Sequence, residues 1–294
     1  MTDNHNPRET SAVRRPVGIF DSGLGGLTAL REIRRILPGE DLIYFGDTGR
    51  VPYGTRSHET ICHYAVQDLR FLLSEADCKA VVIACGTVTA NALPLLQSAF
   101  SVPIIGVIDP AAKAAVRATK NGKIGVIATQ SSIASGAYDR ALAELEPEVS
   151  LISRACPLFV PLVENGFVDP DDPIPLLTAE RYLADIKASG ADTVILGCTH
   201  YPLLKGIISK VLPGVALIDT GEEVAHALKT LLDTEEPAEA DTGRTGDVQY
   251  FVSDETQGFA AAASRFLGLD ITSKAPLGEV RRIDIEAYSG ILNP

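Results

Sequence analysis

Two short stretches, VVIACGT at residues 81–87 and TVILGCTH at residues 193–200, share one pattern. Each runs an apolar, β-branched segment into a loop that carries a cysteine and a threonine. An apolar segment of this length is typical of a parallel strand that is covered on both faces. In α/β sheets, ligands collect beyond the carboxyl ends of strands, so the two loops can face one cleft between two similar domains. The alternative is a coincidence between two short Val-, Ile- and Ala-rich runs.

The rest of the chain repeats this alternation of short apolar runs and longer amphipathic stretches, which indicates α/β architecture with mainly parallel sheets flanked by helices. The predicted strands are 17–20, 42–45, 80–84, 104–107, 124–128, 194–196, 215–218 and 248–252. The predicted helices are 26–37, 57–74, 88–99, 110–120, 132–145, 175–189, 221–232 and 255–267. We therefore expect two similar domains, with the active site in the cleft between them.

The expected division has a flexible N-terminal arm at residues 1–15, because this segment is polar and charged. Residues 16–110 and 223–294 form the first α/β domain, and residues 111–222 form the second. The segment 233–247 is rich in acid, Pro and Gly, which favours a solvated linker, with an interaction tail as the alternative.

Composition and charge narrow the classes of function. The chain has 294 residues, 46% hydrophobic content and a formal net charge of -12. Such an anionic field opposes nucleic-acid backbones and anionic membrane surfaces, so neither is an expected partner. There is no signal peptide and no apolar run long enough to span a bilayer. Five cysteines without a CxxC pair indicate a reducing cytoplasm with free thiols.

Two of these cysteines stand out by position. Cys85 and Cys198 each end an apolar strand just before a predicted helix. Thiolate is the reactive form of cysteine, and a helix N-terminus is expected to lower the pKa of such a thiol. For Cys62, Cys78 and Cys156 we favour the reading of small buried hydrophobic residues.

The loop DSGLGG at residues 21–26 follows the strand VGIF directly. Its glycines permit a tight turn and a close approach of backbone to a ligand. It fails the GxGxxG dinucleotide pattern and lacks the GK[ST] of a P-loop. The loop can instead present the Asp21 carboxylate and the Ser22 hydroxyl to a small polar molecule, and a purely structural turn is the alternative. His200 lies two residues beyond Cys198, within reach of a nucleophile or base.

Seven motifs together, in this order, resemble the aspartate/glutamate racemase family over residues 16–270. They are DSGLGG (21–26), GDTGRVPYG (46–54), ACGT (84–87), IGVIATQSSIASGAY (124–138), ACPLFVPLVE (155–164), GCTHYPLL (197–204) and LIDTGEEVA (217–225). The resemblance implies two α/β domains around a cleft, a homodimer, and a racemase that supplies D-glutamate for peptidoglycan without a cofactor or metal.

The resemblance also implies roles for single residues. The family's paired proton-transfer thiols correspond to Cys85 and Cys198. Its carboxylate that assists one thiol falls on Asp21, and its histidine that assists the other falls on His200. A further acidic helper falls on Glu164. Contacts to the substrate fall on Asp21, Ser22, Tyr53, Gly54, Gly86, Thr87, Thr199 and His200, and more weakly on Thr129.

One position departs from the family pattern. The family has Asn-Thr after the first cysteine, whereas this chain has Gly86-Thr87. Glycine has no side-chain amide to contact a bound amino acid. Either water or Asn91 replaces that hydrogen bond, or affinity and substrate choice differ.

The two-thiol arrangement suits inversion of a stereocentre, because the proton leaves one face of Cα and arrives on the opposite face. Two fixed groups on opposite walls avoid moving a single base. The α-proton is weakly acidic, so preorganised donors, helix N-termini and exclusion of water must stabilise the developing charge.

Three other functions remain open. One is a racemase of the same family that acts on aspartate, because a difference of one methylene is worth only ~1–3 kcal/mol. Another is a hydrolase or amidase that uses Cys198, His200 and Glu164 and gives Cys85 no task. The third is a non-catalytic binding protein, for example an inhibitor of a DNA enzyme, which the acidic surplus would suit.

Overall fold

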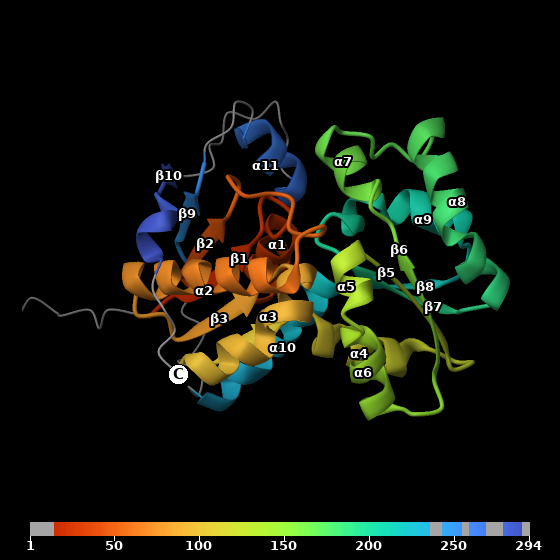
Figure 1. Cartoon of the computed structure of the whole chain (residues 1–294), viewed down its shortest axis with the longest axis horizontal. Coiled ribbons are helices and arrows are strands. Elements are labelled where there is room, and N and C mark those ends of the chain that lie inside the picture. The colour runs from red at the N-terminus through yellow and green to blue at the C-terminus, as the bar shows by residue number, and fades with distance from the viewer. Residues whose placement is uncertain (1–14, 236–242, 255–258, 269–278, 290–294) are drawn as a thin grey trace, which may run out of the picture.

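Two parallel sheets, side by side in Figure 1, form the framework of the protein. The computed structural model describes residues 15–235, 243–254, 259–268 and 279–289. The six-stranded sheet has the order β10-β9-β2-β1-β3-β4, and the four-stranded sheet has the order β6-β5-β7-β8. The strand pairings in both sheets are parallel. The predicted α/β class with two mainly parallel sheets is therefore confirmed.

The sheets divide the chain unevenly. The larger sheet consists of β1 (Val17–Asp21), β2 (Leu42–Gly46), β3 (Ala80–Ile83), β4 (Ile104–Gly106), β9 (Val248–Val252) and β10 (Val280–Arg282). The smaller sheet consists of β5 (Lys123–Ala128), β6 (Ser150–Ala155), β7 (Thr193–Gly197) and β8 (Ala216–Asp219). The central strands β1, β3 and β7 are buried at every residue, as their apolar sequences predict for a sheet covered on both faces.

Helices cover the sheets and connect the two halves. They are α1 (Leu27–Ile36), α2 (His58–Glu75), α3 (Gly86–Ala99), α4 (Ile108–Ala118), α5 (Gln130–Ala134), α6 (Ala137–Leu145), α7 (Phe159–Glu164), α8 (Pro173–Ser189), α9 (Lys205–Val211), α10 (Thr220–Glu235) and α11 (Phe259–Leu267). Two 3₁₀ helices are η1 (Tyr201–Leu204) and η2 (Ile285–Tyr288). Helix α10 carries the chain back to the larger sheet and packs against both α1 and α4. None of the helices in the described ranges is long and apolar enough to cross a membrane.

Several elements differ from the sequence prediction. The helix expected at 132–145 is two helices, because Gly136 adopts a φ of 66° between them. Strand β6 was not predicted, because it is a half-exposed edge strand whose sequence SLISRA has no apolar run. The short edge strand β10 (VRR) was missed for the same reason. Most of the arm at 1–15, much of the linker at 233–247 and the first four residues of the helix at 255–267 lie outside the described residues.

Candidate active site

A cavity of about 370 Å³ lies between the carboxyl ends of strands from both sheets. The loops that follow β1, β2 and β3 form one side, and the loops that follow β5, β6 and β7 form the other. Ligands of proteins with parallel sheets usually bind at this end of the strands. Its lining includes Ser22, Tyr53, Gly54, Cys85, Gly86, Thr87, Thr129, Glu164, Cys198, Thr199 and His200. The structure thus brings together every predicted site residue except Asp21.

Cys85 supplies the thiol on the side of the larger sheet. It is the N-cap residue of α3, and its Sγ donates to Ser22 Oγ at 3.4 Å. Burial, with the nearby charge of Asp21, raises the pKa of Cys85 to about 12. The expected lowering of this pKa is therefore wrong. The backbone N–H of Val88 at the helix start does favour the thiolate, but desolvation outweighs it.

Asp21 lies behind Cys85 at the end of β1 and is almost fully buried. Its Oδ2 accepts a hydrogen bond from the Gly23 N–H at 3.0 Å, and no partner in the described part of the chain reaches Oδ1. Burial raises the pKa of Asp21, whereas the charge of His200 and backbone N–H groups oppose the rise. Asp21 is not among the residues that line the cavity, and it lies close enough to Cys85 for its charge to raise the pKa of that thiol.

On the opposite side, Cys198 begins a chain of three side chains. Its Sγ lies 3.8 Å from His200 Nδ1, and His200 Nε2 lies 3.1 Å from Glu164 Oε1. Burial opposes the charged form of His200, but the hydrogen bonds to Cys198 and Glu164 outweigh it and raise its pKa to about 10. His200 is therefore placed to exchange a proton with Cys198. Cys198 precedes the 3₁₀ helix η1, so the α-helix expected directly after it is absent there.

Small polar side chains close the cavity between the two thiols. Thr87 Oγ1 and Thr129 Oγ1 lie 2.9 Å apart and join the two halves across the cavity. Thr28 Oγ1 donates to the Thr199 carbonyl at 2.9 Å from the β1–α1 side. A small ligand in the cavity therefore meets hydroxyl groups from both halves.

Two glycines allow this close approach of the halves. A Cβ at Gly25 would overlap Thr199 Oγ1 and lie 2.6 Å from His200 Nδ1. A Cβ at Gly86 would lie 2.6 Å from the Gly197 carbonyl oxygen. The glycines of DSGLGG were expected to approach a ligand, but Gly25 instead makes room for the loop that carries His200.

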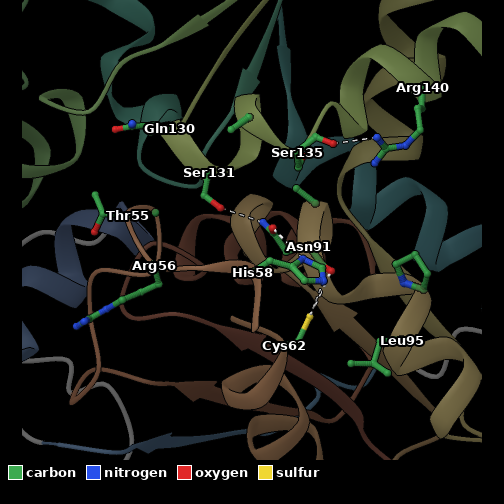
Figure 2. Close-up of a pocket in the computed structure, with 14 residues that line it drawn as sticks. Thr55, Arg56, His58, Cys62, Asn91, Leu95, Gln130, Ser131, Ser135 and Arg140 are labelled. Atoms are coloured by element: carbon green, nitrogen blue, oxygen red, sulfur yellow. Dashed lines mark hydrogen bonds between the residues drawn. The ribbon is translucent and has the colours of Figure 1, made fainter. Parts of the chain in front are cut away.

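Asn91 is one candidate to supply the amide that Gly86 lacks. It lines an adjoining cavity of about 800 Å³ between α2, α3 and α5, which Figure 2 shows and which shares Gly54, Thr55 and Gln130 with the smaller cavity. Its Nδ2 donates to the Thr87 carbonyl at 2.8 Å and to Ser131 Oγ at 3.1 Å. The Asn91 amide is thus engaged by the Thr87 carbonyl and by Ser131, and Asn91 is not among the residues that line the cavity with the two thiols.

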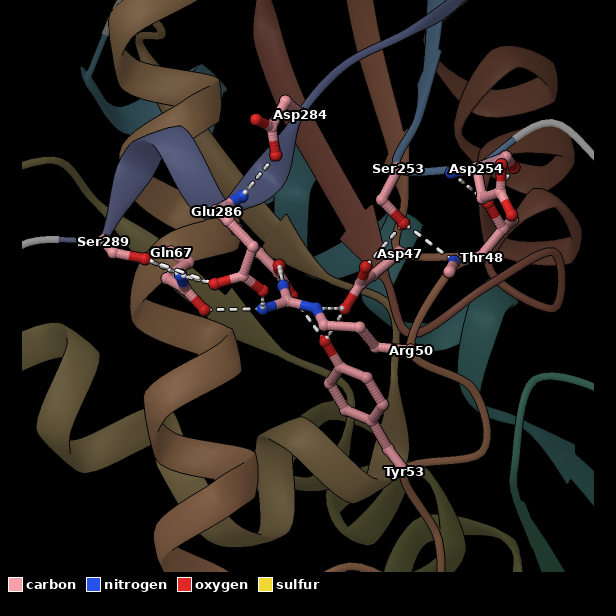
Figure 3. A network of polar contacts seen from close by, with 12 residues as sticks. Asp47, Thr48, Arg50, Tyr53, Gln67, Ser253, Asp254, Asp284, Glu286 and Ser289 are labelled. Carbon is pink, nitrogen blue, oxygen red and sulfur yellow. Dashed lines mark hydrogen bonds and ion pairs between the residues drawn. The ribbon is translucent and has the colours of Figure 1, made fainter.

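Tyr53 lines the cavity, but its hydroxyl belongs to a buried ionic network that Figure 3 shows. This hydroxyl contacts Asp47 Oδ2 and lies 3.2 Å from Asp68 Oδ2. The Arg50 guanidinium bonds both carboxylates, at 2.6 Å and 2.9 Å. The network fixes the loop from 47 to 54, so only the ring and backbone of Tyr53 remain for a ligand.

The number of protons in this network predicts different effects of substituting Asp68 and Asp47. A phenol has one proton, so it cannot donate to both Asp47 and Asp68. Burial and the charge of Asp47 raise the pKa of Asp68 well above its usual value, so Asp68 can be the neutral partner that donates to Tyr53. We expect Asp68→Asn to change the free energy of unfolding little, because an amide makes the same two bonds. We expect Asp47→Asn to lower it by about 3 kcal/mol or more, because it breaks a buried ion pair.

Urea unfolding of the two variants measures this difference. Equal losses in both variants would contradict a neutral Asp68.

Some lining residues were not predicted. Gln130 directly follows Thr129 at the end of β5, and Val160 and Pro161 belong to α7. The position of Gln130 at a strand end was a usable signal, whereas α7 follows the edge strand that the sequence does not reveal. Within the described ranges, no group of three or more His, Cys, Asp or Glu side chains is arranged to hold a metal ion.

Comparisons with known proteins agree on one family. The model of the family described as Asp/Glu/Hydantoin racemase matches residues 25–228. A glutamate racemase of Geobacter metallireducens is 46% identical, over 93% of this chain and 98% of that protein. A glutamate racemase of Persephonella marina is 44% identical, over 87% and 94%. A crystal structure of glutamate racemase from Francisella tularensis in complex with D-glutamate superposes with a TM-score of 0.84 and 35% identity, over 93% and 99%.

Proposed function

Because the chain belongs to the Asp/Glu/hydantoin racemase family, we propose that it interconverts L- and D-glutamate by proton transfer at Cα between two thiols. The observation that carries this proposal is the pair Cys85 and Cys198 in the lining of one small cavity. Each has its own polar neighbours: Ser22 contacts Cys85 and the charge of Asp21 acts on it, whereas His200 contacts Cys198. The product, D-glutamate, would supply peptidoglycan synthesis.

In the proposed reaction, the thiolate of one cysteine takes the α-hydrogen as a proton, and the electron pair of the C–H bond stays on Cα. The thiol of the other cysteine then gives its proton to the opposite face of Cα. The enzyme ends with the charge on the second sulfur, and His200 and the groups around Cys85 restore the starting protonation. The Thr87, Thr129 and Thr199 hydroxyls, together with Ser22, are donors for the negative charge that develops on the substrate.

The experiment that tests this function is incubation with L- or D-glutamate in D2O without any added cofactor. We expect inversion together with one solvent deuterium at Cα, measured by chiral chromatography and mass spectrometry. L- and D-aspartate are run in parallel, and faster turnover of aspartate would assign the chain to that substrate instead. Absence of exchange with every amino acid tested would favour a binding protein.

We extend the proposal to the organisation of the protein. The domains would be residues 16–110 with 223–294, and residues 111–222. The membership of the two sheets supports this division, because β1 to β4, β9 and β10 share one sheet and β5 to β8 share the other. We also propose a homodimer, by the resemblance to the family, and a cytoplasmic location, which the five free cysteines support.

A further inference from the structure

Helix α11 comes from the half of the protein that carries Cys85, yet two of its side chains contact the residues behind Cys198. Arg265 Nη1 donates to the Glu164 carbonyl at 3.0 Å and to the Val163 carbonyl at 3.2 Å. Phe266, fully buried, meets the His200 ring edge to face, with ring centroids 5.1 Å apart. One helix therefore contacts both members of the pair that serves Cys198.

The contact of Arg265 is placed where it can orient Glu164. Helix α7 ends at Glu164, and the last carbonyls of a helix have no partner within it. The Val163 carbonyl already accepts from the Gly166 N–H at 3.0 Å, so the guanidinium is a second donor to it and a donor to the Glu164 carbonyl. A cation at this end also complements the dipole of the helix. The chain then turns at Gly166 with a φ of 85°, and a Cβ there would lie 3.2 Å from Arg265 Nη2. The glycine thus serves both the turn and the approach of the arginine.

We propose that Arg265 is a positioning residue for the reaction, which fixes the end of α7 so that Glu164 holds His200 against Cys198. Phe266 supports the same His200 ring from its side. This inference rests on the proposed racemase function. Because α11 belongs to the other half, the relay behind Cys198 is complete only when the halves are docked together, which links docking to proton transfer.

The direct test is the titration of His200, because a merely structural arginine would not move it. The groups that face His200 are Cys198, Glu164, Thr199 and the charge of Asp21. The hydrogen bond to Glu164 is one of the contacts that favour the protonated ring. We expect Arg265→Ala to lower the His200 midpoint by about one pH unit, since a nearby carboxylate is worth about that much. The measurement is NMR of the ring, with the signal assigned by its loss in His200→Asn.

The kinetic test is a double-mutant cycle with Glu164. We expect Arg265→Ala to lower kcat on the order of tenfold, because displacement of a positioned group by about 1 Å costs up to 10²-fold. Glu164→Gln should have a similar effect, and the double variant should be no worse than Glu164→Gln alone. Arg265→Lys should retain part of the activity, because its ammonium can still donate to the same carbonyls. Arg117→Ala, which removes an exposed arginine that pairs with Glu223 at 3.5 Å, is the matched control and should keep full activity.

An unchanged His200 midpoint in Arg265→Ala, or fully additive kinetic losses, would overturn the positioning role. Failure of the proposed function is recognised separately. If the wild type exchanges no α-hydrogen, the racemase proposal falls, while the NMR midpoints still decide whether Arg265 orients the Glu164–His200 pair.

Discussion

Replacing either Cys85 or Cys198 with serine is expected to lower the rate of racemisation by roughly 10³-fold, because a general acid or base contributes about that much. A serine hydroxyl is far less acidic than a thiol, so it neither holds a negative charge nor delivers a proton at the required rate. The rest of the cavity stays intact, because the two side chains differ only in one atom. The measurement is chiral chromatography of L- and D-glutamate turnover at saturating substrate.

The two variants should differ in which enantiomer still exchanges. In Cys85→Ser, Cys198 and its His200 partner remain, so the enantiomer whose α-hydrogen faces Cys198 should gain deuterium in D2O without inversion. Cys198→Ser should show the opposite preference. Cys62→Ser is the control, since that thiol lies outside the catalytic cavity and contacts His58 Nε2 at 3.6 Å. A variant of Cys85 that keeps wild-type racemisation would contradict the two-thiol mechanism.

The position of both thiols could be predicted because it depends on a strong local signal. The strands AVVI and TVILG are fully buried, and Cys85 and Cys198 follow their ends by two residues and one residue, at the carboxyl edge of each sheet. Once each sheet is parallel, this edge is the natural place for ligands. His200 and Ser22 follow from the same argument, since they lie within three residues of a strand end.

The protonation states could not be predicted in the same way, because burial depends on the whole fold. A helix start was expected to lower the pKa of Cys85, yet closure of the cavity removes water and raises this pKa instead. The orientation of the Asn91 side chain could not be predicted either, because its amide donates to Ser131, which lies on a helix 40 residues away in sequence. The Glu164 carbonyl accepts from Arg265, which lies 101 residues further along the chain. Long-range packing decides each of these features, and no local pattern encodes it.

Gly86 gives the second large expected effect, because it sets the separation of the two thiols. A Cβ added at Gly86 by substitution would lie only 2.6 Å from the backbone oxygen of Gly197. Gly86 adjoins Cys85 in sequence, and Gly197 adjoins Cys198. A backbone oxygen cannot rotate away as a side chain can, so relief requires the start of α3 and the end of β7 to move apart. The two sulfurs would then move apart with them.

We therefore expect Gly86→Ala to lower kcat about tenfold and Gly86→Asn about 10²-fold, since misplacement by about 1 Å costs that much. Gly206→Ala is the matched control, because its Cβ would be 3.4 Å from Pro170 Cγ, an ordinary contact, and alanine favours the helix α9. Thermal unfolding of all three separates loss of fold from loss of geometry. An asparagine variant with wild-type or higher kcat/KM for glutamate would contradict this account. It would mean that the two halves can move apart without loss of activity. It would also mean that the side-chain amide of the family pattern can be restored.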